Sequence, residues 1–384
     1  MTVLTEETQL GSVLCSFAEH DEFGYSPSIV SRALAVLASG VQSLSGYLDP
    51  PLQDRVSRLP LDWLCILERD PVVRSATEQA LSDEAHAGTV APDCALSELL
   101  TEILDSLARR SDQHSTGEAM PQLPTVAAMT GTWRIGPPAI SDAVHVLSPN
   151  MEDSPVSSTF WRMFREFIHD SEHPEDELLS PAPKHVDVLQ TALNTLCEVV
   201  PELASGVFAH APTLCIVTDD CTFKSMSHRQ FPGTIFLSER SLDSVWTTAD
   251  ALLHEALHHK LLDLHLISSM VRAEVAGDDF PMVVSPWNAP PNEWILGRAL
   301  FAFHVYAHLT AFAACARVRR SDSSPSVSEL AQMQSVAGRR AHYLGSRVVE
   351  VGEPVLSPRG HRLCQWLMHQ TMALDDGSFA LGPI

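Results

Sequence analysis

The chain has few basic residues for its size. It carries 25 Lys and Arg against 48 Asp and Glu, which gives a formal net charge of −23 over 384 residues. Nucleic-acid phosphates and anionic membrane surfaces both require a basic face on the protein that binds them. We therefore expect no nucleic-acid partner and no membrane partner, and a well-solvated acidic surface is the simplest consequence of the charge.

The sequence also lacks cysteine motifs and a secretory signal. Its eight cysteines include no Cys-x-x-Cys pair, which argues against a disulfide framework and against a cysteine-ligated zinc. The first residues, MTVLTEETQLGSVLCSF, carry early glutamates and no basic stretch followed by an apolar run, in contrast to a signal peptide. We therefore expect reduced thiols in a cytoplasmic protein.

Long hydrophobic runs are scarce. The run to consider is Ala299 to Ala316, which has 18 residues without a formal charge and is just long enough for a membrane span. It contains His304 and His308, and arginines lie close to both of its ends. Because histidine inside a membrane is costly, we predict a buried helix of a folded core.

What the sequence contains is a folded, mostly helical pattern. A hydrophobic content of 45% with 19% charged residues is typical of a globular protein. Apolar residues recur at helical spacing in the ranges 29–41, 61–67, 96–107, 157–167, 186–203, 247–266, 299–316, 337–349 and 363–373. The polar stretch 110–124 is the best linker. We predict an N-terminal helical region, 1–120, and a metal-binding catalytic domain, 121–384, in a mainly α fold with a small β-sheet (α+β).

The chemistry is concentrated in the helix predicted from Thr247 to Leu266. It contains His254, Glu255 and His258 in the order His-Glu-x-x-His. Residues four apart on a helix project from one face about one turn apart, so both imidazoles can bind one metal ion. The sequence therefore predicts a metal site with Glu255 beside it.

Two short strands are predicted immediately before this helix. The runs LCIVTD and GTIFLS are apolar and β-branched and are bounded by turn residues. A strand beside a His-Glu-x-x-His helix is typical of zinc peptidases, in which an extended peptide pairs with an edge strand. We expect Gly233 to Ser238 to be that edge, with Gly233 and Ile235 as substrate-binding residues, in a zincin-like local geometry.

Catalysis requires a third metal ligand and an open position. His265 follows in the same helix but lies about 10 Å further along the axis than His258, so it cannot bind the same ion. Glu274 and Glu293 would each complete a set of two histidines and one glutamate. Glu293 follows two prolines, at the very start of any helix.

The uncharged run supplies the preferred third ligand. A buried imidazole needs a partner, and His304 stands in the middle of that helix. His308 lies one turn on and can orient His304 or bind the substrate. A core histidine bonded to a backbone carbonyl is the alternative for either residue.

Five segments of the chain resemble a known family. They are PGTIFLS, ALLHEALHHK, the SPW loop at Ser285 to Trp287, FAFHVYAHL and LSPRGHRL, and together they cover about Pro212 to Leu363. The combination resembles the bacterial HExxH-motif proteins found with ribosomally synthesised peptide natural products, which are iron- and 2-oxoglutarate-dependent peptide hydroxylases. The arginine-rich segment that the family has after the SPW loop is here NAPPNEWILGR, in which Arg298 is the nearest basic residue.

The resemblance implies a hydroxylase that acts on a C–H bond in a side chain of a precursor peptide. His254, His258 and a third ligand would bind Fe(II), with the remaining positions left for 2-oxoglutarate and O₂. The distal carboxylate of 2-oxoglutarate needs a cation as a partner. Arg298, Arg340 and Lys260 are the candidates for that partner, and Arg298 is nearest in sequence to the helix with the third ligand.

Two other functions use the same residues. In a zinc metallopeptidase the histidine pair would bind Zn²⁺, and Glu255 would act as general base on the bound water. A hydroxylase needs no general base, so Glu255 would instead orient a ligand histidine. A peptide-binding protein without catalysis is a third class, which the intact motif disfavours.

Overall fold

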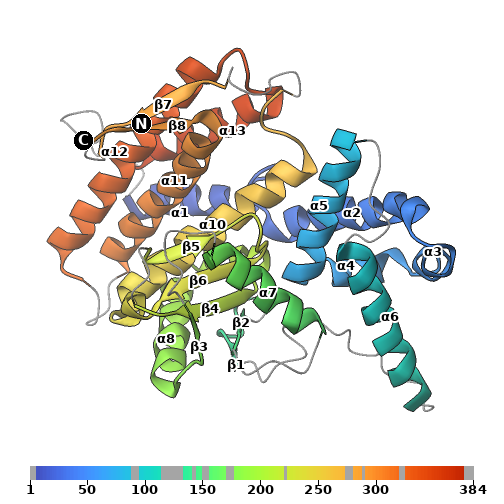
Figure 1. Cartoon of the computed structure of the whole chain (residues 1–384). Coiled ribbons are helices and arrows are strands. Elements are labelled where there is room, and N and C mark those ends of the chain that lie inside the picture. The colour runs from blue at the N-terminus through green and yellow to red at the C-terminus, as the bar shows by residue number, and fades with distance from the viewer. Residues whose placement is uncertain are drawn as a thin grey trace.

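The structure, a computed structural model, describes residues 6–87, 95–113, 133–140, 144–148, 155–169, 177–219, 223–272, 280–287, 290–319 and 325–375. Helices dominate it, and a small mixed sheet lies near the centre (Figure 1). The first third of the chain is helical, as predicted. Its helices are α1 (Glu6–Glu19), α2 (Ser26–Leu44), α3 (Pro50–Ser57), α4 (Leu61–Leu67), α5 (Pro71–Ala87) and α6 (Ala95–Gln113).

The middle of the chain supplies the sheet. Its strands are β1 (Trp133–Ile135), β2 (Val144–Val146), β3 (Leu178–Leu179), β4 (Thr213–Val217), β5 (Ser225–Ser227) and β6 (Thr234–Ser238). Their order is β1-β2-β4-β6-β5, and β3 also pairs with β4. The helices of this part are α7 (Pro155–His169), α8 (Pro183–Val199) and α9 (Pro201–Val207). The two strands predicted from the sequence are β4 and β6, which pair in parallel and are buried throughout.

The edge of the sheet is not the strand that was predicted. Strand β6 pairs with β4 on one side and with β5 on the other, so the expectation that Gly233 to Ser238 forms the edge is wrong. Among the described strands, β5 ends the sheet and contacts the motif helix. The segment Ser-Met-Ser contains no β-branched residue, so propensity gives no sign of a strand there.

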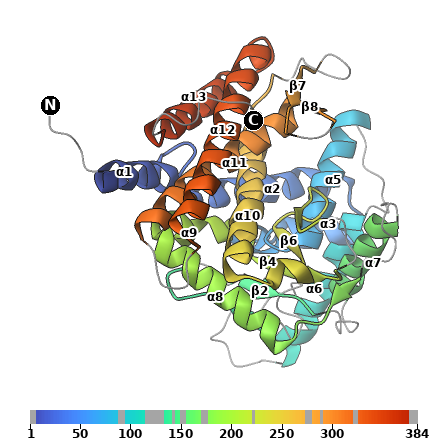
Figure 2. The same ribbon diagram turned by 90° about the vertical axis from the view of Figure 1, so that its left-hand side faces the viewer.

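The C-terminal part forms a layer of long helices. They are α10 (Val245–Ile267), α11 (Leu296–Val318), α12 (Val327–Gly352) and α13 (Pro358–Ala373), with a hairpin of β7 (Met282–Ser285) and β8 (Asn292–Ile295). Helix α10 carries the motif and runs through the centre, with α2, α8, α11 and β5 packed against it (Figure 2). A helix that is apolar on nearly every face can be stable only when it is surrounded in this way.

The sheet separates two hydrophobic clusters. Leu214 and Ile216 of β4 face the cluster built with α1 and α8 to α13, whereas Cys215 and Val217 face the cluster built with α2 to α7. This follows from the alternation of side chains along a strand. Helices α2 to α7 therefore cover one face of the same sheet, and α1 lies with the C-terminal helices on the other. The boundary predicted at residue 120 falls in 114–132, outside the described residues.

Within the part of the chain that the structure describes, two helices have the length and apolar composition of a membrane span, Ser26–Tyr47 and Leu296–Val318. In Leu296–Val318, 83% of the apolar window is buried inside the structure, as predicted for a core helix. The cysteines that the structure describes are free, and Cys215, Cys315 and Cys364 among them are buried.

Candidate metal centre

Helix α10 brings His254 and His258 together. Their Nε2 atoms are 3.2 Å apart, and their rings stand at 71° with centroids 4.9 Å apart. Two imidazole nitrogens that bind one ion at about 2.1 Å, at ordinary coordination angles, are about 3.0 to 3.4 Å apart. The observed spacing therefore fits a shared metal ion without movement of the helix.

His258 is held in the form that binds metals. Burial lowers its pKa to about 4, with the neighbouring His254 and His259 acting in the same direction and Glu255 opposing them. The ring also stacks on Phe301 of α11, with centroids 5.9 Å apart. A neutral imidazole keeps a lone pair on nitrogen at pH 7, which is what a ligand requires.

Both carboxylate oxygens of Glu255 are bonded to the edge strand. Ser225 Oγ donates to Oε1 at 2.7 Å, and Ser227 Oγ donates to Oε2 at 2.6 Å. Burial would raise the pKa of Glu255, but the electrostatic interactions with the two neighbouring imidazoles and the two hydroxyl donors prevail, and the pKa is lowered. The motif glutamate is therefore an ionised acceptor that ties α10 to β5.

The next residue of α10 fixes the helix to β6. His259 Nδ1 accepts the backbone N–H of Gly233 at 3.2 Å, and its Nε2 donates to the carbonyl oxygen of Thr234 at 2.8 Å. Gly233 has φ +73, a conformation that favours glycine. Ile235 is fully buried inside the sheet. Gly233 and Ile235 therefore support the motif helix, and neither lies on a free strand edge.

Lys260 is fully buried and anchors the N-terminal helices. Its Nζ donates to the carbonyl oxygens of Phe17 at 3.3 Å and Gly24 at 2.7 Å. Burial lowers the pKa of Lys260 to about 7. Its amino group is thus committed to the α1–α2 connection, on a different side of α10 from Glu255, and is not available to 2-oxoglutarate in this arrangement.

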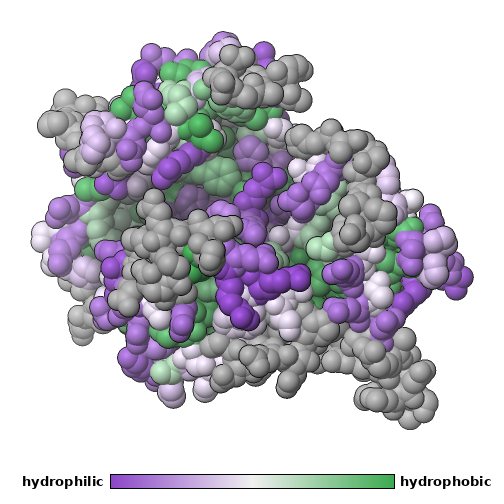
Figure 3. Space-filling view, viewed as in Figure 1, coloured by the Kyte–Doolittle hydropathy of each residue, from purple (hydrophilic) through white to green (hydrophobic). Residues whose placement is uncertain are grey.

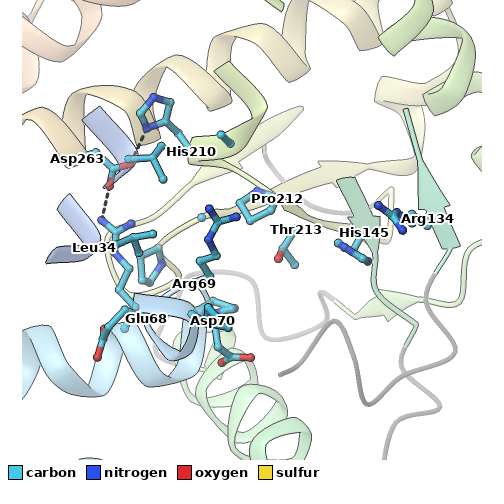
Figure 4. Close-up of a pocket in the computed structure, with 17 residues that line it drawn as sticks. Leu34, Glu68, Arg69, Asp70, Arg134, His145, His210, Pro212, Thr213 and Asp263 are labelled. Atoms are coloured by element: carbon cyan, nitrogen blue, oxygen red, sulfur yellow. Dashed lines mark hydrogen bonds and ion pairs between the residues drawn. The ribbon is translucent and has the colours of Figure 1, made fainter. Parts of the chain in front are cut away.

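A buried ionic network fixes the C-terminal half of α10. Asp263 accepts from His210 Nδ1 at 2.6 Å and pairs with the Arg74 guanidinium at 2.7 Å (Figure 4). Burial would raise the pKa of Asp263, but Arg74 and His210 outweigh it and lower that pKa. The network joins α10 to α5 and to the segment before β4, beside a cavity of about 250 Å³.

A larger cavity of about 910 Å³ opens beside His258, and after the reaction predicted at this site we name it the catalytic cavity. His258 and Phe301 lie in its wall, Ser227 of β5 at one side, and Arg229 and Arg298 also line it. Figure 3 shows this face hollowed above α10 and α11, with hydrophobic residues at the bottom of the hollow. The volume is in the range of ligand-binding pockets.

The catalytic cavity is lined by cations although the protein as a whole is acidic. Arg229 and Arg298 are exposed, and neither forms an ion pair with a described residue. The Arg298 guanidinium lies over the Trp294 ring, 5.0 Å from its centroid. His265 lines the cavity as well, and burial, together with Arg359 and Arg229, lowers its pKa to about 4. Such a lining suits a carboxylate ligand.

The structure does not bring His304 into a three-ligand group. His304 and His308 are fully buried, and neither lines the catalytic cavity. His308 Nδ1 donates to the His304 carbonyl oxygen at 2.8 Å, and the His308 ring stacks on Phe17 with centroids 4.1 Å apart.

Both ring nitrogens of His304 lack a hydrogen-bond partner among the described residues, and burial lowers the pKa of His304 well below the usual value. Within the same residues, no three His, Cys, Asp or Glu side chains are grouped around one metal position. Metal binding by His304 and substrate binding by His308 remain predictions.

Those of the other candidate residues that the structure describes lie on different elements. Glu274 lies outside the described residues, and Glu293 is exposed in strand β8 and does not begin a helix. Arg340 donates to the Tyr306 hydroxyl at 2.9 Å and stacks on Trp287 at 5.1 Å, away from the catalytic cavity. Of the two arginines predicted to bind the cofactor, only Arg298 shares a cavity with His258.

Three residues of the site were not found from the sequence. Ser225 and Ser227 are two apart, so their side chains leave β5 on the same side, and this spacing is a signal once a strand is known there. Arg229 follows two residues later and had no local signal. Each depends on the position of β5 beside α10, which is a tertiary property.

No protein-family model and no curated protein matches the sequence. What the protein does must therefore follow from the side chains described above.

Proposed function

We propose that the protein is an Fe(II)- and 2-oxoglutarate-dependent hydroxylase that acts on a side chain of an extended peptide. His254 and His258 would hold the metal, and the spacing of their Nε2 atoms and the neutral state of His258 support this. Iron bound with 2-oxoglutarate and O₂ supplies the oxidising power to place an oxygen atom in an unactivated C–H bond, with succinate and CO₂ as coproducts.

The hydrogen bonds and the lowered pKa of Glu255 favour a hydroxylase over a metallopeptidase. A metallopeptidase needs this glutamate as a general base with a pKa near the working pH, directed at the metal-bound water. Here both oxygens accept from the serines of β5, and the pKa is lowered. A hydroxylase requires no base at this position. The glutamate can then serve as the anchor that keeps α10, and with it both histidines, in register with the edge strand.

The lining of the catalytic cavity supports a dicarboxylate cosubstrate. Arg298 and Arg229 stand at its rim without an acidic partner among the described residues, and His258 lies in the same wall. A guanidinium binds a carboxylate through two parallel hydrogen bonds, so either arginine can hold the distal carboxylate of 2-oxoglutarate. Among the described strands β5 pairs only with β6, so its other side offers main-chain groups to an extended peptide.

A zinc metallopeptidase is the second candidate, because a described edge strand does lie beside the motif helix. The two reactions differ in metal, cosubstrate and product. The glutamate and both histidines are shared, so the presence of a metal alone does not distinguish them.

The test is anaerobic loading of the full-length protein with Fe(II), followed by 2-oxoglutarate, a peptide library and air. Succinate release with a mass gain of one oxygen on a peptide supports the hydroxylase, and both are expected to be lost in His254→Ala. Peptide cleavage with zinc that disappears in Glu255→Ala would replace the hydroxylase with the peptidase. Failure of the wild type to bind either metal at a stoichiometric level excludes both enzymes.

A further inference from the structure

A second cavity adjoins the catalytic cavity. This second cavity has a volume of about 690 Å³ and shares Glu78, His228 and Arg229 with the catalytic cavity. It lies between α5, α6 and α7, on the side of the molecule built by the N-terminal helices. The two cavities therefore adjoin along these three residues, with His258 in the first and helices that carry neither motif histidine around the second. We name the second volume the distal cavity.

We propose that the distal cavity is an exosite that binds the substrate peptide at residues remote from the one that reacts. The inference rests on the proposed function in that it takes a peptide as the substrate. The reaction itself needs room for one side chain and 2-oxoglutarate, and the catalytic cavity of about 910 Å³ already provides it. An adjoining cavity that shares part of the same wall suits a ligand longer than one side chain.

The segment that joins the two cavities is held rigidly. Ser227, the last residue of β5, lines the catalytic cavity, and His228 and Arg229 line both. The His228 ring packs on Phe167 of α7, with centroids 4.6 Å apart. A peptide added to the open side of β5 is therefore directed along His228 and Arg229 into the distal cavity without a change in the fold.

The lining of the distal cavity defines what it binds. Val72 and Leu99 form a buried apolar floor, and Met163 adds a flexible apolar wall. Arg162, Arg229 and Glu166 stand at the exposed rim, whereas the charge of Glu78 is taken by the buried Arg74 at 2.9 Å. Because the two arginines outnumber Glu166 at the rim, the cavity fits an apolar side chain of the peptide with a neighbouring carboxylate at Arg162 or Arg229. Binding at such a site lowers the concentration of peptide needed without altering the chemical step.

The helix α7 offers a matched pair of charge reversals. Arg162→Glu changes the rim of the distal cavity, and Arg165→Glu makes the same change at an exposed position of the same helix that does not line it. A second pair tests volume: Ala76→Trp fills the cavity from α5, and Ala85→Trp adds the same ring at an exposed position of α5. Circular dichroism checks that all four variants fold.

The probe is a display library of random peptides of about 12 residues, which reach about 40 Å when extended at about 3.3 Å per residue. Binders selected on the full-length wild type are measured by fluorescence anisotropy, without iron or 2-oxoglutarate. We expect binders with acidic and apolar residues, whose dissociation constants rise about tenfold in Arg162→Glu and in Ala76→Trp and stay unchanged in the two controls.

Absence of any peptide that binds the wild type overturns the inference, as does equal binding by the cavity variants and their controls. Because no turnover is needed, the test is independent of the reaction. Peptide binding that depends on Arg162 in a protein that releases no succinate would reject the proposed function and keep the exosite. Succinate release together with unchanged peptide binding in Arg162→Glu would reject the exosite and keep the proposed function.

Discussion

The contact between Glu255 and β5 can be tested directly by removing one donor. Ser227→Ala deletes the hydroxyl that donates to Glu255 Oε2 at 2.6 Å and leaves the Ser225 bond to Oε1 in place. Glu255 is 4% exposed, so water does not readily replace the lost donor. The substitution adds no volume and alters no charge.

The expected cost is that of a hydrogen bond to a buried charge, about 1.5 to 3 kcal/mol of the free energy of unfolding at pH 7. The sign with pH follows from the lowered pKa of Glu255. A carboxyl group whose pKa is lower in the folded state contributes stability above its unfolded pKa, which is about 4.3, and loses it as the pH falls through the folded value. The effect of Ser227→Ala is therefore largest at neutral pH and shrinks below pH 4.

The assay is urea unfolding of the wild type, Ser227→Ala, Glu255→Gln and the double variant at pH 7. We expect a coupling energy of about 1.5 to 3 kcal/mol between the two sites, since each single change removes the same bond. Ser244→Ala is the control, because that exposed serine precedes α10 and its hydroxyl makes no capping bond to the helix, and it is expected to cost less than about 0.5 kcal/mol. A coupling energy near zero would refute the claim that this bond joins β5 to α10.

Three further predictions concern function and acid stability. Glu255→Gln is expected to keep succinate release within about tenfold of the wild type, whereas loss of a general base lowers turnover by about 10² to 10⁴; a loss of that size would favour the peptidase. Arg298→Glu is expected to raise the KM for 2-oxoglutarate about tenfold or more with little effect on metal binding, and Arg165→Glu to change neither; an unchanged KM would assign the cosubstrate to another cation. Burial lowers the pKa of His308 to about 3, so the unfolded protein binds a proton there that the folded protein does not. Stability should therefore fall as the pH drops from about 6.5 toward 3, by up to about 1.4 kcal/mol per pH unit from this residue, and His308→Leu should reduce the slope measured by urea unfolding.

The local elements of the fold could be read from the sequence. The helices α10 and α11 and the strands β4 and β6 appear within a few residues of their predicted ranges. Apolar spacing and β-branched runs are properties of a short segment, and burial of that segment in a core only strengthens them. The position of His254 and His258 on one helical face follows in the same way, because a four-residue spacing has one outcome on a helix.

Tertiary structure alone decided which side chains meet this pair. Nothing in Ser225-Met226-Ser227 marks a strand, yet its place at the end of the sheet puts both hydroxyls on Glu255. Gly233 and Ile235 became interior for the same reason, because the edge of a sheet depends on which strand pairs last.

Tertiary structure also decided which cations line the catalytic cavity. Arg229 and Arg298 are far apart in the sequence and share the catalytic cavity, whereas Arg340 is drawn to Trp287 and Tyr306. The sequence by itself determined the helix that carries the two histidines. The partners of that helix were decided by packing between segments far apart in the sequence, which a local pattern does not encode.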